Sequence, residues 1–187
     1  KCLKEFLLEK KKYPDEPFIY NILGILSAHK SAFDESIKSY SKAIELDPNY
    51  FEAYNNIGVA YTSWKKIEKA IQNFDKAIKI NPLYAEAFNN KGNALKEKGK
   101  YQLAASCYEK ALSINPNYID AMTNLGIIWD LMNNFSKAKS YFQKALSLNP
   151  NNTSVLYNLA NSFFNYDNFN QSINVCQKII EIDKSFY

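Results

Sequence analysis

A proline recurs every 34 residues along this chain, and no other feature limits its fold as strongly. The members of this series are Pro14, Pro48, Pro82, Pro116 and Pro150. Proline lacks a backbone N–H and disfavours α-helical geometry at the residue before it, so a helix should end near each one. The sequence therefore predicts an array of repeats that share the same helix boundaries.

Each repeat contains two stretches of helical periodicity separated by a short polar break. In the second repeat, Tyr54, Ile57, Gly58 and Tyr61 follow one another at spacings of one to three residues along one helix face, and apolar residues over 67–78 continue the pattern. This periodicity predicts two antiparallel helices per repeat. An Asp or Asn before each later proline is expected to cap the next turn through its side-chain oxygen. These residues are Asp47, Asn81, Asn115 and Asn149.

Small residues recur at the positions where the paired helices should cross most closely. In the first helices they are Gly24, Gly58, Gly92, Gly126 and Ala160, and in the second helices they are Ser36, Ala70, Ala104, Ala138 and Ser172. Glycine inside a helix costs roughly 0.5 to 1 kcal/mol relative to alanine, so its repetition needs a packing reason. Large residues of the second helices fill the space beside them, namely Tyr40, Phe74, Tyr108 and Phe142. We therefore expect these positions to form the core and not a cofactor site.

The combined pattern resembles the tetratricopeptide repeat (TPR) family, whose 34-residue units read W/Y-x-x-L-G-x-x-Y followed by A, F/Y, A and P. The resemblance implies an all-α fold, a right-handed superhelical solenoid of antiparallel helix pairs. It places five repeats at residues 17–50, 51–84, 85–118, 119–152 and 153–186. Residues 1–16 resemble the second helix of a truncated preceding repeat followed by a linker.

Two places depart from the TPR pattern. Lys91 stands where the family has leucine, and its stem should cover apolar surface while its ammonium group reaches water. In the last repeat, the usual aromatic, alanine and proline are replaced by Cys176, Ile179 and Lys184. Because solenoid ends normally need a polar outer face, we expect exposed apolar side chains there, at Ile173, Ile179 and Ile180. The natural protein is therefore expected either to continue past Tyr187 or to self-associate through its uncapped ends.

Few residues are able to support catalysis or hold a cofactor. His29 is the only histidine, so a Ser-His-Asp arrangement has a single candidate base and a two-histidine metal site cannot form. The five glycines form no phosphate-binding string. Acidic residues such as Glu52, Glu86 and Asp120 recur on successive first helices and should not converge as a catalytic pair. The sequence predicts that the chain is not an enzyme and has no catalytic residue, cofactor or metal.

Charge and composition bear on the partners and the compartment. All 23 basic residues are lysine, and a net charge of +4 is too small to indicate a nucleic-acid partner. A lysine column on the second helices is expected to be solvated; it comprises Lys42, Lys76, Lys110, Lys144 and Lys178. Apolar runs are far shorter than the ~20 residues that cross a bilayer, so no membrane partner is expected. Cys2, Cys107 and Cys176 are widely spaced, which favours a cytoplasmic localisation.

Asparagines repeat on one face of the first helices, which line the concave surface in the TPR family. They are Asn21, Asn55, Asn56, Asn89, Asn90, Asn93, Asn124, Asn158 and Asn161. An amide side chain has donors and an acceptor for the backbone of an extended peptide, and the series is similar to the asparagine ladder in the TPR arm of protein O-linked N-acetylglucosamine transferases. We predict a peptide-binding groove here. The alternative is that these amides bond to adjacent helices or to water.

The resemblance favours a protein-protein interaction module, a scaffold or adaptor that binds an extended peptide or partner segment in its concave groove. TPR co-chaperones that bind a C-terminal carboxylate use groove lysines and arginine, but of the matching positions here only Asn56 fits, and Glu86 would repel a carboxylate. A second interpretation is a substrate-recruiting arm of a larger glycosyltransferase or sulfotransferase whose catalytic domain lies outside this chain. The expected partner is a protein or peptide in both cases.

Overall fold

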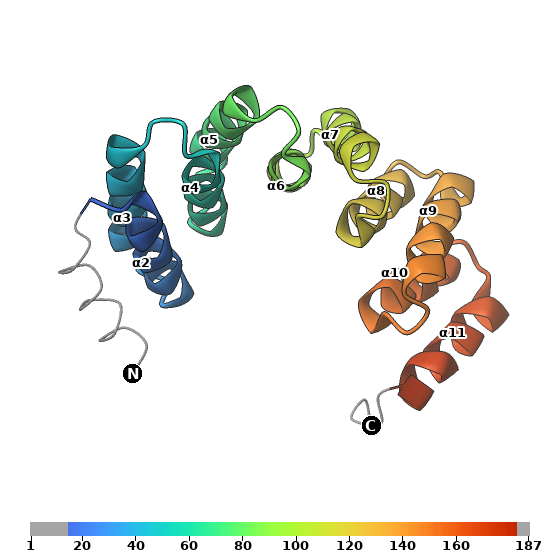
Figure 1. Ribbon diagram of the computed structural model, residues 1–187. Helices are drawn as coiled ribbons and strands as arrows, with labels where there is room; N and C mark the ends of the chain where they lie inside the picture. Colours follow the sequence, from blue (N-terminus) through green and yellow to red (C-terminus); the bar gives the residue numbers. More distant parts are fainter. Residues whose placement is uncertain (1–14, 183–187) are drawn as a thin grey trace. The chain divides into compact units, whose positions relative to one another are not determined.

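The computed structural model describes residues 15–182, and this part of the chain consists of ten α-helices joined by short loops (Figure 1). The first helices of the successive pairs are α2 (Pro17–His29), α4 (Phe51–Ser63), α6 (Ala85–Glu97), α8 (Ile119–Leu131) and α10 (Thr153–Asn165). The second helices are α3 (Phe33–Leu46), α5 (Ile67–Ile80), α7 (Tyr101–Ile114), α9 (Phe135–Leu148) and α11 (Phe169–Ile182). The interpretation of residues 1–16 as a preceding helix and linker falls largely on residues 1–14, outside the described part.

The chain divides into two compact units, residues 1–98 (unit 1) and 99–187 (unit 2). Within unit 1, each helix from α2 to α6 packs against the next helix in sequence, and the same holds from α7 to α11 in unit 2. First helices of successive pairs also touch, with α2 against α4 and α4 against α6 in unit 1, and α8 against α10 in unit 2. Side chains on adjacent first helices can therefore interact directly.

The second helices end where the prolines predict. The predicted Asp and Asn caps are also present: Asp47 Oδ1 accepts the N–H of Asn49 at 2.9 Å, and Asn81 Oδ1 accepts the N–H of Leu83 at 3.0 Å. Equivalent bonds form at Asn115 and Asn149. These oxygens close the turn that contains the proline, two residues beyond the end of the helix.

The loop between the two helices of each pair contains one residue in the left-handed backbone region. These residues are Ser31, Lys65, Gly99, Asn133 and Asp167, with φ between 57° and 72°. A side chain at such a φ costs about 1 kcal/mol or more, a cost that glycine does not have. Gly99 fits this geometry without cost and Asn133 and Asp167 are residue types that adopt it, so Ser31 and Lys65 fit it least.

Replacing Ser31 with glycine should stabilise unit 1 by roughly 0.5 kcal/mol, because relief of left-handed strain outweighs the extra chain entropy of glycine when unfolded. Urea denaturation of the Ser31→Gly variant measures this gain. The matched control is Lys30→Gly, at an adjacent residue whose φ is −92°; it should lower stability. Equal effects of the two substitutions would contradict the interpretation.

The predicted small-residue positions are buried, as close helix crossing requires. In unit 1, Tyr40 and Ala43 of α3 pack with Ala53 and Ile57 of α4. In unit 2, a larger cluster joins α8, α9 and α10; its buried members are Met122, Ala138, Phe142, Ala145, Val155, Leu159 and Phe163. These contacts confirm that the recurring small and aromatic residues are core.

The predictions about four single residues have different outcomes. Ile173 is exposed and Ile180 is half-buried, but Ile179 is only 5% exposed, so its predicted exposure is wrong. Ile179 occupies the position of the alanine that packs inside the earlier pairs, which explains its burial. The ammonium group of Lys91 does not simply reach water, because Nζ lies 2.6 Å from Asp75 Oδ1 on α5.

Candidate functional site

The first helices of unit 1 present a continuous stripe of side chains at helical spacing. We define the first-helix stripe as Phe18, Asn21, Ile22 and Ile25 on α2, Glu52, Asn56 and Val59 on α4, and Glu86, Asn90 and Asn93 on α6. Residues three and four apart share one side of a helix, so these residues lie on corresponding faces. Phe18 and Val59 are 49% and 42% exposed, so the stripe includes accessible apolar surface. The stripe therefore combines apolar, amide and acidic groups.

Pairs of asparagines link adjacent first helices within this stripe. Nδ2 of Asn56 donates to Oδ1 of Asn21 at 2.9 Å, which joins α4 to α2. Nδ2 of Asn90 donates to Oδ1 of Asn55 at 3.1 Å, which joins α6 to α4 in the same way. Each bond spans 35 residues, one more than the repeat. We call each such pair an asparagine clasp.

A tyrosine at the end of the repeat completes each clasp. Nδ2 of Asn55 donates to Glu86 Oε1 at 3.2 Å and to the Tyr84 hydroxyl at 3.5 Å, and that hydroxyl donates to Glu86 Oε2 at 3.1 Å. Tyr50 occupies the equivalent place beside Asn21. Burial and the nearby Glu52 carboxylate raise the pKa of Tyr50, while its hydrogen bond with Asn21 acts in the opposite direction. Tyr50 is therefore protonated at neutral pH.

The predicted binding asparagines fall into different classes. Asn55 has no exposed surface and Asn89 is 5% exposed, so both amides are buried, and their contact with a ligand stays a prediction. Asn55 is covered by its hydrogen-bond partners Asn90 on the adjacent first helix and Tyr84 at the end of the repeat. Asn21, Asn56, Asn90 and Asn93 are half-buried on the stripe, and their contact with a ligand stays a prediction.

The clasp is not formed between α8 and α10 in unit 2. Thr123 stands at the Asn21 position and donates instead to the Ile119 carbonyl at 2.8 Å, while Asn158 donates to the Ser154 carbonyl at 2.9 Å. A different bond links the two helices, from Ser162 Oγ to Asp130 Oδ1 at 2.8 Å. The remaining predicted residues of this unit are Asn124, which is half-buried, and Asn161, which is exposed.

The clasps determine which amide atoms stay open on the stripe. Because Nδ2 of Asn56 and of Asn90 is directed to the neighbouring helix, the Oδ1 atom of each amide lies on the opposite side of the group. Within residues 15–182 neither oxygen has a hydrogen-bond partner, and neither is among the buried unpartnered atoms. These oxygens are therefore open acceptors on the stripe.

The acidic residues of the stripe are not balanced by neighbouring cations. Glu52 forms no ion pair within the described residues, and the described partners of Glu86 are the uncharged Asn55 and Tyr84. On α6, the ammonium group of Lys91 is paired with Asp75. The pKa of Lys96 is lowered, chiefly because burial disfavours its charged form. Glu52 and Glu86 thus give this part of the surface acidic character.

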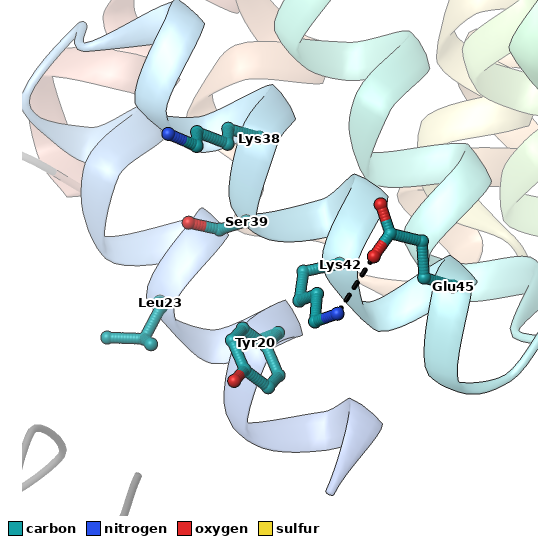
Figure 2. Close-up of a pocket in the computed structure, with 6 residues that line it drawn as sticks. All are labelled: Tyr20, Leu23, Lys38, Ser39, Lys42 and Glu45. Atoms are coloured by element: carbon teal, nitrogen blue, oxygen red, sulfur yellow. Dashed lines mark hydrogen bonds and ion pairs between the residues drawn. The ribbon is translucent and has the colours of Figure 1, made fainter. Parts of the chain in front are cut away.

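A pocket of about 460 Å³ lies beside α2 and α3 and is a different kind of feature (Figure 2). Its lining is Tyr20, Leu23, Lys38, Ser39, Lys42 and Glu45, and a 2.9 Å ion pair joins the last two charged groups. In the next pair, Ile57 occupies the place of Leu23 and packs against Tyr40 and Ala43 of α3. The pocket is therefore part of a stacking surface and not of the first-helix stripe.

The described part of the chain has neither a metal-binding group nor a membrane-spanning helix. Between residues 15 and 182, no three or more His, Cys, Asp or Glu side chains are grouped so that they could hold a metal ion. No helix in this part is long and apolar enough to cross a membrane. His29 is exposed at the end of α2, and all five residues of the lysine column are exposed on the second helices.

Comparison with known proteins identifies the type of repeat. The sequence model of a family described as the tetratricopeptide repeat protein 21 C-terminal ARM domain matches residues 1–187. Among curated proteins, no match to this chain was found. The predicted resemblance to TPR proteins is thus confirmed by a match over the whole chain.

Solved structures with a similar fold include MamA, PilF and YrrB. A MamA protein has a TM-score of 0.74 at 24% identity, with 90% of this chain and 92% of that chain covered. PilF of Pseudomonas aeruginosa has a TM-score of 0.81 at 23% identity, with 89% and 76% covered. YrrB, described as a TPR protein with an unusual peptide-binding site, has a TM-score of 0.69 at 21% identity, with 96% and 92% covered. These similarities confirm the predicted all-α repeat fold.

Proposed function

Because the chain belongs to the family of the tetratricopeptide repeat protein 21 C-terminal ARM domain, we propose that it is a protein-interaction module that binds an extended polypeptide on the first-helix stripe of unit 1. The observation that carries this proposal is the pair of open acceptors, Oδ1 of Asn56 and Oδ1 of Asn90. Each is held in one orientation by a clasp, and the two lie on adjacent helices.

The spacing of the helices suits an extended chain. Helices packed directly against each other lie roughly 8–10 Å apart, a distance that about three extended residues cover. Backbone N–H groups of such a segment can therefore reach Asn56 and Asn90 in turn, whatever its side chains are. The description of YrrB as a TPR protein with a peptide-binding site is in line with this use of the fold.

The double variant Asn56→Ala/Asn90→Ala should bind peptides roughly tenfold more weakly than the wild type. Each lost backbone hydrogen bond contributes about 0.5–1.5 kcal/mol, and two such bonds together correspond to about one order of magnitude in Kd. Binding to an array of unrelated peptides, followed by titration of the best ones, measures the loss. Circular dichroism establishes that the variant is folded.

The control for this experiment is Asn73→Ala, which removes a half-buried amide from the second helix α5. The Asn73 side chain only donates to the Lys69 carbonyl of its own helix at 2.8 Å. This control should bind peptides like the wild type. If the folded double variant binds every peptide with wild-type affinity, the stripe is not the binding surface.

A further inference from the structure

We infer that the segment bound on the first-helix stripe carries a basic side chain, lysine or arginine, which lies against Glu52 and Glu86, with apolar side chains towards α2. This inference rests on the proposed function and specifies the chemistry of its partner. It begins from the polarity of the hydrogen-bonding groups. The clasps occupy the donor side of Asn56 and Asn90 and leave their Oδ1 atoms open.

Apart from the Asn93 amide, the other polar groups of the stripe at α4 and α6 are also acceptors. Ionised carboxylates only accept hydrogen bonds, and each has about four acceptor sites. Glu86 uses part of this capacity for Asn55 and Tyr84, and these two bonds hold its carboxylate in place. Glu52 forms no ion pair within residues 15–182. A surface whose open groups are acceptors favours a ligand rich in donors.

Charge complementarity favours a basic side chain over an uncharged hydrogen-bond donor in the bound segment. Two lysines of unit 1 are already engaged: Lys91 on α6 pairs with Asp75 at 2.6 Å, and Lys65, just after α4, pairs with Glu97 at 3.2 Å. Lys96 lies near the end of α6, with much of its side chain buried. At α4 and α6, Glu52 and Glu86 thus keep negative charge that an incoming lysine or arginine can neutralise.

The apolar side chains of the stripe determine which residues we expect in the other half of the bound segment. Phe18 on α2 and Val59 on α4 are each more than two-fifths exposed. Ile22 and Ile25, the other apolar residues of the stripe on α2, are half-buried. Exposed apolar side chains grouped with polar ones are typical of interaction surfaces. The expected segment is therefore amphipathic, with apolar residues over α2 and a basic residue over α4 and α6.

Glu52 and Glu86 also have a structural role that must be separated from binding. Each is the second residue of its helix, where a carboxylate interacts favourably with the helix dipole. A purely structural role predicts that their substitution changes stability but not peptide preference. Glu35, an exposed acid and the third residue of α3, also lies in the first turn of its helix but outside the stripe. It is the matched control.

The experiment uses the full chain and peptides of roughly eight residues, long enough to pass over three adjacent helices. Each peptide with apolar residues at one end is made in three forms, with Lys, Gln or Glu at a single position near the other end. Wild type should bind the Lys form about three- to tenfold more tightly than the Glu form, and 0.5 M salt should reduce this ratio. Glu52→Lys should abolish or reverse the preference, and Glu35→Lys should retain it.

The outcomes separate this inference from the proposed function. If Lys, Gln and Glu forms bind equally well and Asn56→Ala/Asn90→Ala weakens all of them, the peptide-binding function stands and the inference is wrong. If Glu35→Lys removes the preference as effectively as Glu52→Lys, the effect is one of net charge and the inference is also wrong. If no peptide binds the wild type, both are overturned.

Discussion

Replacement of Asn55 with alanine should lower the free energy of unfolding of unit 1 by about 3 kcal/mol. Asn55 is completely buried, and its amide makes bonds to Asn90, Glu86 and Tyr84. The substitution removes these bonds and leaves Nδ2 of Asn90 and Oε1 of Glu86 without this partner, while Glu86 Oε2 keeps its bond from Tyr84. Loss of one buried hydrogen-bonding partner costs about 1–3 kcal/mol, and the cavity left by the side chain adds to it.

Chemical denaturation monitored by circular dichroism measures this effect. Asn158→Ala is the matched control, because Asn158 is a first-helix asparagine of unit 2 whose amide only bonds to the Ser154 carbonyl of its own helix. Its removal should cost less than about 0.5 kcal/mol. A double-mutant cycle with Asn90→Ala should give a coupling energy of at least about 0.5 kcal/mol. Equal stabilities of Asn55→Ala and Asn158→Ala would contradict the clasp.

The helical architecture was predictable because its determinants are local. The effect of Pro48 on the preceding helix and the bond from Asp47 Oδ1 to the Asn49 N–H involve residues two or fewer apart. Likewise, helical spacing alone places Ile57 on the buried side of α4. Such features depend on backbone geometry that a short stretch of sequence determines.

The role of the asparagines was only partly predictable. Their shared face follows from the 34-residue period, but whether an amide faces a ligand or a neighbouring helix depends on packing between repeats. One indication was present in the sequence: two asparagine columns are offset by one residue, and tyrosines accompany them at Tyr50, Tyr84 and Tyr118. Where Thr123 and Asn152 replace the asparagine and the tyrosine, the clasp is absent. When both asparagine columns and the tyrosine are present, the sequence therefore indicates that the asparagines of adjacent first helices hydrogen-bond to each other.

Charge pairing was the least predictable feature. The sequence places Lys91 among apolar residues of α6, but its ion pair with Asp75 depends on how α6 packs against α5. The same packing leaves Glu52 without a described ion pair. Because long side chains reach partners on other helices, a formal charge count cannot identify which carboxylates are compensated. The acidic character of the stripe thus became visible only with the side chains in place.

Replacement of Gly58 with valine should destabilise unit 1 by about 3 kcal/mol, although valine is a slightly better helix former than glycine. A Cβ atom built on Gly58 would lie 2.5 Å from Cε1 and 2.7 Å from Cδ1 of Phe74, well inside van der Waals contact. The Phe74 ring is 1% exposed, so it cannot swing into solvent. Overpacking of a dense core costs about 1–3 kcal/mol or more, which outweighs a propensity gain of less than 1 kcal/mol.

Size complementarity along the array supports this expectation and supplies its control. Glycine faces an aromatic ring at Gly58 and Gly126, but in the last pair Ala160 takes the glycine position and Cys176 replaces the ring. Ala160→Gly should therefore cost about 1–2 kcal/mol, from helix propensity and from the loss of one buried methyl group. Phe74→Leu should restore part of the stability lost in Gly58→Val, because the smaller side chain leaves room for the new methyl groups. Denaturation of the single and double variants tests both statements. Additive losses in the double variant would mean that the ring and the glycine do not share the same space.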